Sequence, residues 1–477
     1  MPEIPLTVQD AAAALRAGEL TSVDLTQAML DRADELDSQL GTYLARFDRQ
    51  ALANAERADA ELRDGLDRGP FHGIPVGVKD ILAASEGPTT AQSLILDPDW
   101  GAGKDAPIVK RLRRAGAVIT GKTSTMEFAC GVPDPTKPFP IPRNPWDLDT
   151  WPGGSSSGTG SGIAAGLFLA GIGTDTGGSI RIPAAFCGVS GLMPTFGRVP
   201  KSGCTPLGYS LDHVGPLARS AWDCAGMLQV LAGYDPSDPD CIDVPVPDYL
   251  SGLSGSLAGL RIGVERAHHF PEERDPLVEG CFDAALEVLK QLGARLVDVV
   301  LPLYDEVQAA LMPTCAAESL AYHMSDAQAR WGDYFEGTRA MLARGALVSG
   351  ADYVQAQRLR RVAQRQLVGL LDTVDVVVMP TSAVGAFRYG QDDLLDIERL
   401  FKLVFTSYWD AVGNPALVVP MGFTGEGLPL SLQIAGRAFD EAALLNVGHA
   451  YQQATEWHLQ TPPLTRSTRA PVGSAAS

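Results

Sequence analysis

The glycine- and serine-rich segment at residues 151–183 constrains the fold of this chain more than any other feature. A flexible linker has a similar glycine and serine content. However, a linker would not contain the apolar run at residues 163–169, nor end in Ile-Arg-Ile-Pro at residues 180–183. The apolar run is typical of a buried helix, and the glycines allow the backbone to approach its neighbours closely. The segment therefore predicts a packed part of the core.

Three known glycine-rich motifs offer alternative interpretations of this segment. A phosphate-binding P-loop needs Gly-Lys-Ser/Thr, and no lysine lies between Lys137 and Lys201. A dinucleotide fingerprint needs a third glycine after Gly160 and Gly162, and a strand before the motif. The pattern Gly-x-Ser-x-Gly does occur at residues 154–158, with its central serine as the candidate nucleophile of a hydrolase elbow. The residues before it read as a loop, and no histidine is singled out as a partner, so the elbow remains an alternative.

The rest of the chain alternates helical patterns with short apolar strands. With 45% hydrophobic and 20% charged residues, the 477-residue chain has the composition of a globular protein with a large core. Three helices are expected in residues 1–70, the third around residues 48–66. Strands are expected at residues 74–78, 118–120, 260–264, 296–300, 374–379 and 416–420. This alternation predicts an α/β fold.

Charge and cysteine usage exclude several classes of function. The formal net charge of −19, with no run of Lys and Arg, argues against nucleic-acid binding. The seven cysteines are scattered and include no Cys-x-x-Cys pair, which argues against a disulfide framework and a thiolate zinc site. The longest apolar stretch, residues 162–172, is shorter than the ~20 residues that span a bilayer. With no signal-peptide pattern at residues 1–10, we expect a cytoplasmic protein that does not bind membranes.

Long motifs in and around the glycine-rich segment resemble the amidase signature family of serine hydrolases. Within the segment and just after it, the matching blocks are residues 153–156, 173–181, 183–188 and 191–195. Elsewhere, the matching blocks are residues 73–80, 210–219, 413–416 and 428–436. The resemblance covers roughly residues 7–460. Thr159 stands where the family usually has Gly and Met193 where it usually has Lys, so we expect local packing changes at these two positions.

The resemblance implies a catalytic trio. Ser179 would be the nucleophile, Ser155 a bridging serine in a cis peptide, and Lys79 the base. The chemistry is consistent with these residue types, because a serine hydroxyl is a weak nucleophile until a base takes its proton. A lysine can be that base only when neutral, and its ordinary pKa of ~10.4 prevents this at pH 7. Because Lys79 follows an apolar strand, we expect burial to lower its pKa.

Residues around the trio have expected supporting roles. The backbone N–H groups of Thr176, Gly177, Gly178 and Ser179 are predicted to form an oxyanion hole. Ser156 is predicted to hydrogen-bond within the relay, and Asp175 and Arg181 to fix the loop, the alternative being a surface ion pair. Candidates for the substrate pocket, with plain core packing as the alternative, are Met126, Phe128, Phe139 and Ile141.

The resemblance also implies a fold and an activity. The fold is a single large α/β domain over residues 1–465, a twisted mixed sheet covered by helices, with the catalytic core at residues 71–220 and a disordered tail at residues 466–477. The activity is hydrolysis of a small-molecule amide, anilide or carbamate (urethane) through an acyl-enzyme, with aryl acylamidase or esterase side activity, and with no metal or cofactor.

The sequence alone leaves two alternative functions and the oligomeric state open. Residues 339–349 loosely resemble the A subunit of a glutamine-dependent tRNA amidotransferase, which would need partner subunits. An inactive binding homologue is the alternative from another class. Family members commonly pair as dimers, so a homodimer is a further possibility.

Overall fold

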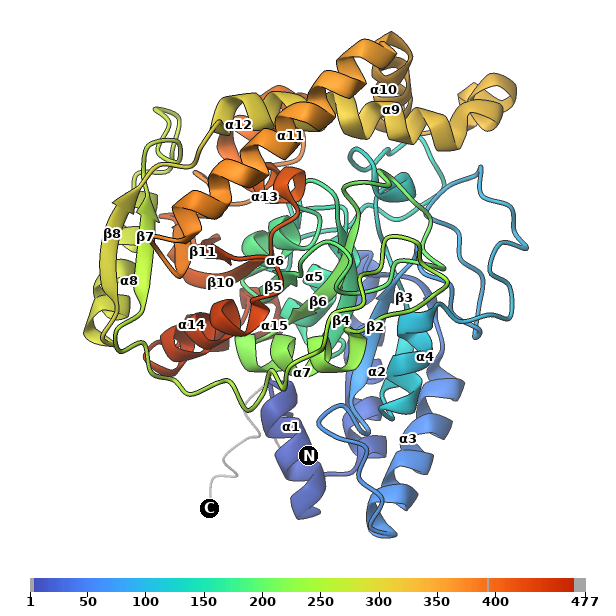
Figure 1. The fold of residues 1–477 in the computed structure, drawn as a ribbon. Helices are drawn as coiled ribbons and strands as arrows, with labels where there is room; N and C mark the ends of the chain where they lie inside the picture. Colours follow the sequence, from blue (N-terminus) through green and yellow to red (C-terminus); the bar gives the residue numbers. More distant parts are fainter. Residues whose placement is uncertain (1–3, 393, 467–477) are drawn as a thin grey trace.

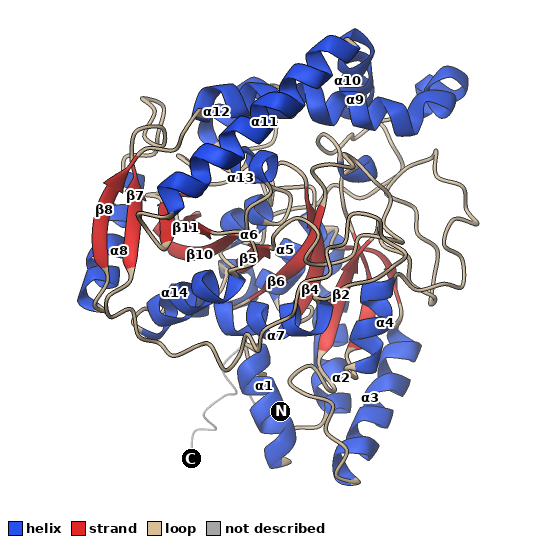
Figure 2. Cartoon of the chain, viewed as in Figure 1, coloured by secondary structure: helices blue, strands red, loops and turns tan. Residues whose placement is uncertain are grey.

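A mixed sheet of eleven strands forms the centre of the computed structural model, which describes residues 4–392 and 394–466 (Figures 1 and 2). In spatial order the strands are β1 (Tyr43–Arg46), β3 (Val118–Thr123), β2 (Pro75–Lys79), β4 (Ala170–Asp175), β6 (His213–Ala218), β5 (Ser190–Met193), β10 (Ala416–Phe423), β11 (Pro429–Gly436), β9 (Val376–Pro380), β7 (Arg261–Glu265) and β8 (Arg295–Val299). β2 is parallel to β3 and β4, and β7 is parallel to β8 and β9. The other pairs are antiparallel, which confirms the predicted mixed α/β sheet.

Helices cover both faces of this sheet and give it two apolar cores. One large cluster joins Ile172 of β4 to the helices α4 (Pro107–Arg114), α7 (Ala221–Leu231), α8 (Val278–Gln291) and α14 (Glu441–Gln453). A second cluster joins Leu217 of β6 to α5 (Ser157–Ala165) and α6 (Arg181–Cys187). Because side chains alternate between the two faces of a strand, neighbouring strands of the sheet can contribute to both cores. α5 overlaps the predicted buried helix at residues 163–169 only over residues 163–165, because the chain turns at Gly166 toward β4, and every residue in α5 is buried.

The N-terminal part is helical as expected, with one addition. α1 (Val8–Ala17) and α2 (Ser22–Leu40) begin after Thr7 and Thr21, whose hydroxyls accept the N–H groups of Asp10 and Asp24. α3 (Asp48–Arg63) ends three residues before the expected position. The addition is the edge strand β1, which the sequence prediction missed because it has only four residues.

Long helices from the second half of the chain lie together beyond one end of the sheet (Figure 1). They are α9 (Tyr304–Arg330), α10 (Glu336–Leu347) and α11 (Gly350–Leu371), and two short helices, α12 (Ile397–Leu403) and α13 (Ser407–Val412), lie beside them. A last short helix, α15 (Pro463–Arg466), ends the described chain. Residue 466, the first of the predicted disordered tail, is the last residue of that helix, and residues 467–477 lie outside the described residues. Among the described residues, no helix is long and apolar enough to span a membrane.

β4 was not predicted as a strand, because two of its six residues are glycines, which weaken strand propensity. The structure shows why they are needed. A Cβ on Gly171 would lie 2.6 Å from Cγ2 of Thr159 and 3.0 Å from the carbonyl oxygen of Gly77. A Cβ on Gly173 would lie 2.7 Å from the Ser156 hydroxyl. The glycines therefore let the helix α5 and the serines before it approach the strand.

Thr159 and Met193, the two departures from the family pattern, are accommodated locally. The Thr159 hydroxyl shares a 2.8 Å hydrogen bond with the Thr123 hydroxyl and lies 3.4 Å from the carbonyl oxygen of Ile172, so it has partners inside the core. Met193 is fully buried in β5 opposite Ala416.

We predict that Gly171→Ala destabilises the protein by about 1–3 kcal/mol, because the new methyl group overpacks the contact between β4 and α5. The measurement is the free energy of unfolding in denaturant. Gly280→Ala is the matched control, since a Cβ there, on α8, meets no atom within 4 Å. Equal stability of both variants would contradict this account of the glycine.

Candidate active site

The three residues of the predicted trio meet at the ends of neighbouring elements. Lys79 is the last residue of β2, Ser155 lies two residues before α5, and Ser179 lies two residues before α6. β2 pairs with β4, and β4 ends at Asp175, four residues before Ser179. The sheet therefore brings Lys79 next to the glycine-rich segment, although 76 positions separate Lys79 from Ser155.

The ammonium group of Lys79 is fully buried and surrounded by hydroxyl groups. Its Nζ donates to Ser155 Oγ at 2.7 Å, to Ser156 Oγ at 3.0 Å and to Thr174 Oγ1 at 2.8 Å. No carboxylate is among the partners described for it. Burial lowers the pKa of Lys79 to about 7, and the more distant carboxylates of Asp175 and Asp212 offset this only in part.

Thr174 is a contact of Lys79 that the sequence analysis missed. It lies inside the matched block at residues 173–181, so the block itself was the available signal. Ser156 holds the position predicted for it, since its hydroxyl also lies 3.3 Å from both the N–H and the carbonyl oxygen of Thr174.

Ser155 and Ser179 line the same small cavity, whose volume is about 80 Å³. The peptide bond between Gly154 and Ser155 is cis, as the resemblance implies. Ser155 is buried and Ser179 is partly exposed, and the N–H of Ser156 donates to the carbonyl oxygen of Ser179 at 3.2 Å. A group that enters this cavity therefore meets both serine residues.

A buried ion pair fixes the loop that carries Ser179. Arg181 Nε donates to Asp175 Oδ2 at 2.9 Å, and neither side chain is exposed, which excludes the alternative of a surface ion pair. Asp175 Oδ2 also accepts the N–H of Ile180 at 3.1 Å. Burial alone would raise the pKa of Asp175, but the charge and hydrogen bonds of Arg181 hold it well below the usual range. The ionised pair ties the loop to the end of β4.

Distant partners complete the environment of Arg181. Its guanidinium donates to Gln433 Oε1 at 3.0 Å and to the carboxylate of Asp410. Burial raises the pKa of Asp410 well above its usual range, and the charge of Asp175 adds to this effect. Gln433 lay in a matched block without an assigned role, and Asp410 carried no sequence signal, because 229 positions separate it from Arg181.

The four predicted oxyanion-hole residues are not equivalent in the structure. The N–H of Gly178 donates to Asp175 Oδ1 at 2.5 Å, so it is already engaged. Gly178 has a φ of 131°, and a Cβ there would lie 2.2 Å from the hydroxyl of Thr406, so only glycine fits. The backbones of Thr176, Gly177 and Ser179 remain as candidate donors at the cavity.

A second buried ion pair lies beside Lys79 and was also missed. Lys122 Nζ lies 2.8 Å from Asp80 Oδ1, and both side chains are buried. Burial lowers the pKa of Lys122, while Asp80 opposes this shift. A lysine inside the apolar strand β3 is the signal that could have revealed the pair. It anchors the backbone that directly follows Lys79.

The pocket residues predicted from sequence lie outside this cavity. Met126 packs beside Gly154, Phe128 packs against the rings of Tyr322, His323 and Tyr334, Phe139 against Phe335, and Ile141 beside Gly41. The cavity at Ser179 is lined instead by residues 129–131, by Leu207, by residues of the glycine-rich segment and by residues of α9, α10 and α12. Because α9, α10 and α12 come from the second half of the chain, local sequence around residue 130 could identify only part of the lining.

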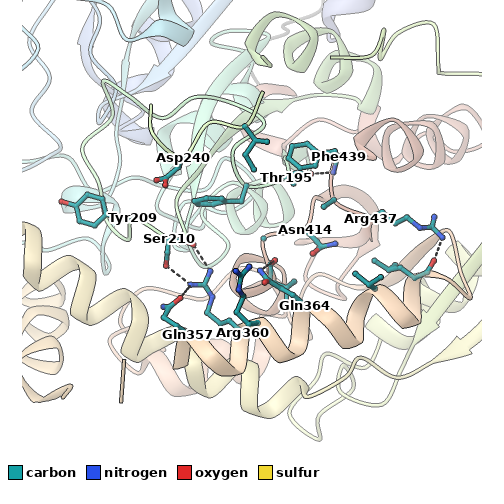
Figure 3. A pocket seen from close by; sticks show the side chains of 18 of the residues that line it. Thr195, Tyr209, Ser210, Asp240, Gln357, Arg360, Gln364, Asn414, Arg437 and Phe439 are labelled. Carbon is teal, nitrogen blue, oxygen red and sulfur yellow. Dashed lines mark hydrogen bonds between the residues drawn. The ribbon is translucent and has the colours of Figure 1, made fainter. Parts of the chain in front are cut away.

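A larger cavity of about 910 Å³ lies away from the serines, between α11 and the loops at Tyr209, Asn414 and Phe439 (Figure 3). It shares no lining residue with the cavity at Ser179. The guanidinium of Arg360 at its wall is engaged by Ser210 at 2.8 Å. This cavity therefore contributes nothing to the chemistry at Ser179.

Known proteins resemble this chain over almost its whole length. It is 41% identical to the A subunit of glutamyl-tRNA(Gln) amidotransferase from Chloroflexus aggregans, over 97% of this chain and 99% of that protein. The corresponding protein of Geobacter metallireducens is 39% identical, over 95% of this chain and 98% of that protein. Among solved structures, the peptide amidase of Stenotrophomonas maltophilia has a TM-score of 0.81 and 33% identity, covering 94% of this chain and 97% of that one.

Another solved structure is described as an unexpected vestigial protein complex that reveals the evolutionary origins of an s-triazine catabolic enzyme. It has a TM-score of 0.87 and 30% identity, and the match covers 94% of this chain and 98% of that one. The family model for amidases matches residues 24–445. The chain therefore belongs to the amidase family.

Proposed function

We propose that this protein hydrolyses the C–N bond of an amide-type substrate, with Ser179 as nucleophile, Ser155 as proton relay and Lys79 as base. The observation that carries the proposal is the buried Lys79, held by three hydroxyl groups and with a pKa of about 7. A neutral amine at this position can accept the serine proton near neutral pH.

The proposed reaction proceeds in two steps, acylation of Ser179 and hydrolysis of the acyl-enzyme. Ser179 Oγ adds to the substrate carbonyl carbon while its proton passes through Ser155 to Lys79. The tetrahedral intermediate, held by backbone N–H groups of the loop, then collapses as the C–N bond breaks and the leaving nitrogen takes the proton. Water attacks the acyl-enzyme in the reverse sense and restores Ser179. A carbamate would react in the same way and lose carbon dioxide afterwards.

The A subunit of a glutamine-dependent tRNA amidotransferase is the second candidate, and the named relatives favour it. They are 39–41% identical over nearly the full length. Such a protein would release ammonia from glutamine and would work with partner subunits. Both candidates use the same chemistry at Ser179, and they differ in the substrate and in the need for partners. A cytoplasmic location and a homodimer remain expectations from the sequence.

We predict that Ser179→Ala lowers kcat on any substrate by at least about 10³-fold, because the nucleophile is lost while the fold is kept. The measurement is turnover by the purified protein, with a nitroanilide, an aliphatic amide, an aryl carbamate and glutamine as substrates. Ser254→Ala, at an exposed serine, should leave turnover unchanged. Retention of turnover in Ser179→Ala would rule out the proposed nucleophile.

We predict that kcat/KM rises about tenfold per pH unit below pH 7 and levels off above it. Below that pKa the amine of Lys79 is protonated and cannot accept a proton, and above it the amine is neutral. The measurement is the pH profile of kcat/KM, which reports the free enzyme. A profile that is flat from acid to alkaline pH would show that Lys79 does not control the reaction.

Lys79→Arg provides the matching variant, because a guanidinium stays protonated at every accessible pH. We expect the Lys79→Arg variant to be inactive at every pH of the kcat/KM profile. Lys110→Arg, at an exposed lysine of α4, should reproduce the wild-type profile.

A further inference from the structure

The cavity at Ser179 carries no charged side chain among its described lining residues. Apart from the hydroxyls of Ser155, Thr176 and Ser179, its walls are formed by apolar side chains, glycines and two thiols. Six of the apolar side chains are Trp151, Leu311, Met312, Met341, Leu400 and Phe401. The thiols are neutral as well, since burial raises the pKa of Cys130 to about 12 and that of Cys315 well above its usual range. The described lining of the cavity therefore offers no ionised side chain to a substrate.

Charged groups are found in two neighbouring cavities. One has a volume of about 350 Å³, shares Ala129, Thr176 and Leu207 with the cavity at Ser179, and has Lys201 and Asp212 in its lining. The other has a volume of about 500 Å³, has Asp305, Glu398 and Lys402 in its lining, and shares Leu311, Met312, Ile397 and Phe401 with the cavity at Ser179. None of the shared residues carries a charge.

Free glutamine does not suit this arrangement. Its side-chain amide would have to reach Ser179, and its ammonium and carboxylate groups, two methylene groups away, would find no ionised partner among the described lining residues of this cavity. Charged groups that lose water without gaining a partner make binding strongly unfavourable. An uncharged alkyl group of the same length gains from the same burial.

The space next to Ser179 is small, and it is not closed off from solvent, since Ser179 is partly exposed. A dry apolar cavity of about 150 Å³ accommodates benzene, whereas this one measures about 80 Å³. A short aliphatic group fits that volume better than a ring. The flexible side chains of Met312 and Met341 allow the walls to adjust slightly.

We propose that the cavity at Ser179 binds a short, uncharged, apolar acyl group, so that neutral aliphatic amides are substrates and free glutamine is not. This inference rests on the proposed function and decides between its two candidates. It sets the chain apart in substrate class from relatives named as parts of a glutamyl-tRNA(Gln) amidotransferase, despite their identity of about 40%.

The test compares four primary amides that share ammonia as the leaving group. Butanamide is the glutamine skeleton without its ammonium and carboxylate groups, glutaramate lacks only the ammonium, and 4-aminobutanamide lacks only the carboxylate. We expect kcat/KM for butanamide to exceed that for glutamine by about 100-fold or more, with the two singly charged amides in between. Ser179-dependent hydrolysis of glutamine at a rate equal to or above that of butanamide would overturn the inference and leave the proposed function intact.

A binding measurement makes the test independent of turnover. Methanesulfonyl fluoride, a small reagent for activated serines, should label Ser179, as detected by mass spectrometry. Butanamide should slow this labelling, and glutamine at the same concentration should not. Protection by glutamine alone would overturn the inference, whereas failure to label Ser179 at all would overturn the proposed function beneath it.

A charged side chain in the wall of the cavity at Ser179 should change the preference of the enzyme between neutral and charged amides. Met312→Lys keeps the length of the side chain and should lower kcat/KM for butanamide while raising that for glutaramate, whose carboxylate gains a partner. Met324→Lys, on the same helix α9 but 44% exposed, is the matched control and should alter neither value. An unchanged ratio of the two substrates in Met312→Lys would contradict the assignment of this wall to the substrate.

Discussion

The burial of one amine among hydroxyl groups is the constraint on which the site depends. Lys79 lies at the end of β2 with no carboxylate among its described partners, so burial lowers its pKa and the more distant carboxylates of Asp175 and Asp212 restore only part of the shift. Neighbouring residues hold Lys79 and its hydroxyl partners in place. Gly173 makes room for the Ser156 hydroxyl, and Lys122 with Asp80 anchors the chain that follows Lys79.

A second buried cation, in an opposite environment, holds the loop that carries Ser179. Arg181 is paired with the ionised carboxylate of Asp175 and contacts Asp410, so the charged form of Arg181 is favoured, whereas burial disfavours the charged form of Lys79. The two cations differ because they have different roles. A guanidinium with several fixed partners positions a backbone, and an amine among neutral hydroxyls can exchange a proton. Removing one partner from the arginine network would leave an uncompensated charge in the core.

The cavity at Ser179 lies in a similarly apolar environment. The low polarity that lowers the pKa of Lys79 also surrounds this cavity, where the walls are apolar side chains and neutral thiols. A charged substrate would lose its hydration in such a place without compensation. We therefore propose that the lining contributed by α9, α10 and α12, and not the fold, selects the substrate.

The sequence by itself indicated the α/β class and six of the eleven strands, because apolar spacing is a local property, and its long motifs indicated the three residues proposed for catalysis. It missed β1, β4, β5 and β6, and in β4 the glycines Gly171 and Gly173, which packing requires, weaken the strand pattern. Only the tertiary structure decided the partners of Lys79 and Arg181 and the walls of the cavity. Thr174 lies 95 positions from Lys79 and Asp410 lies 229 positions from Arg181, and such contacts exist only once the sheet and its helices have packed.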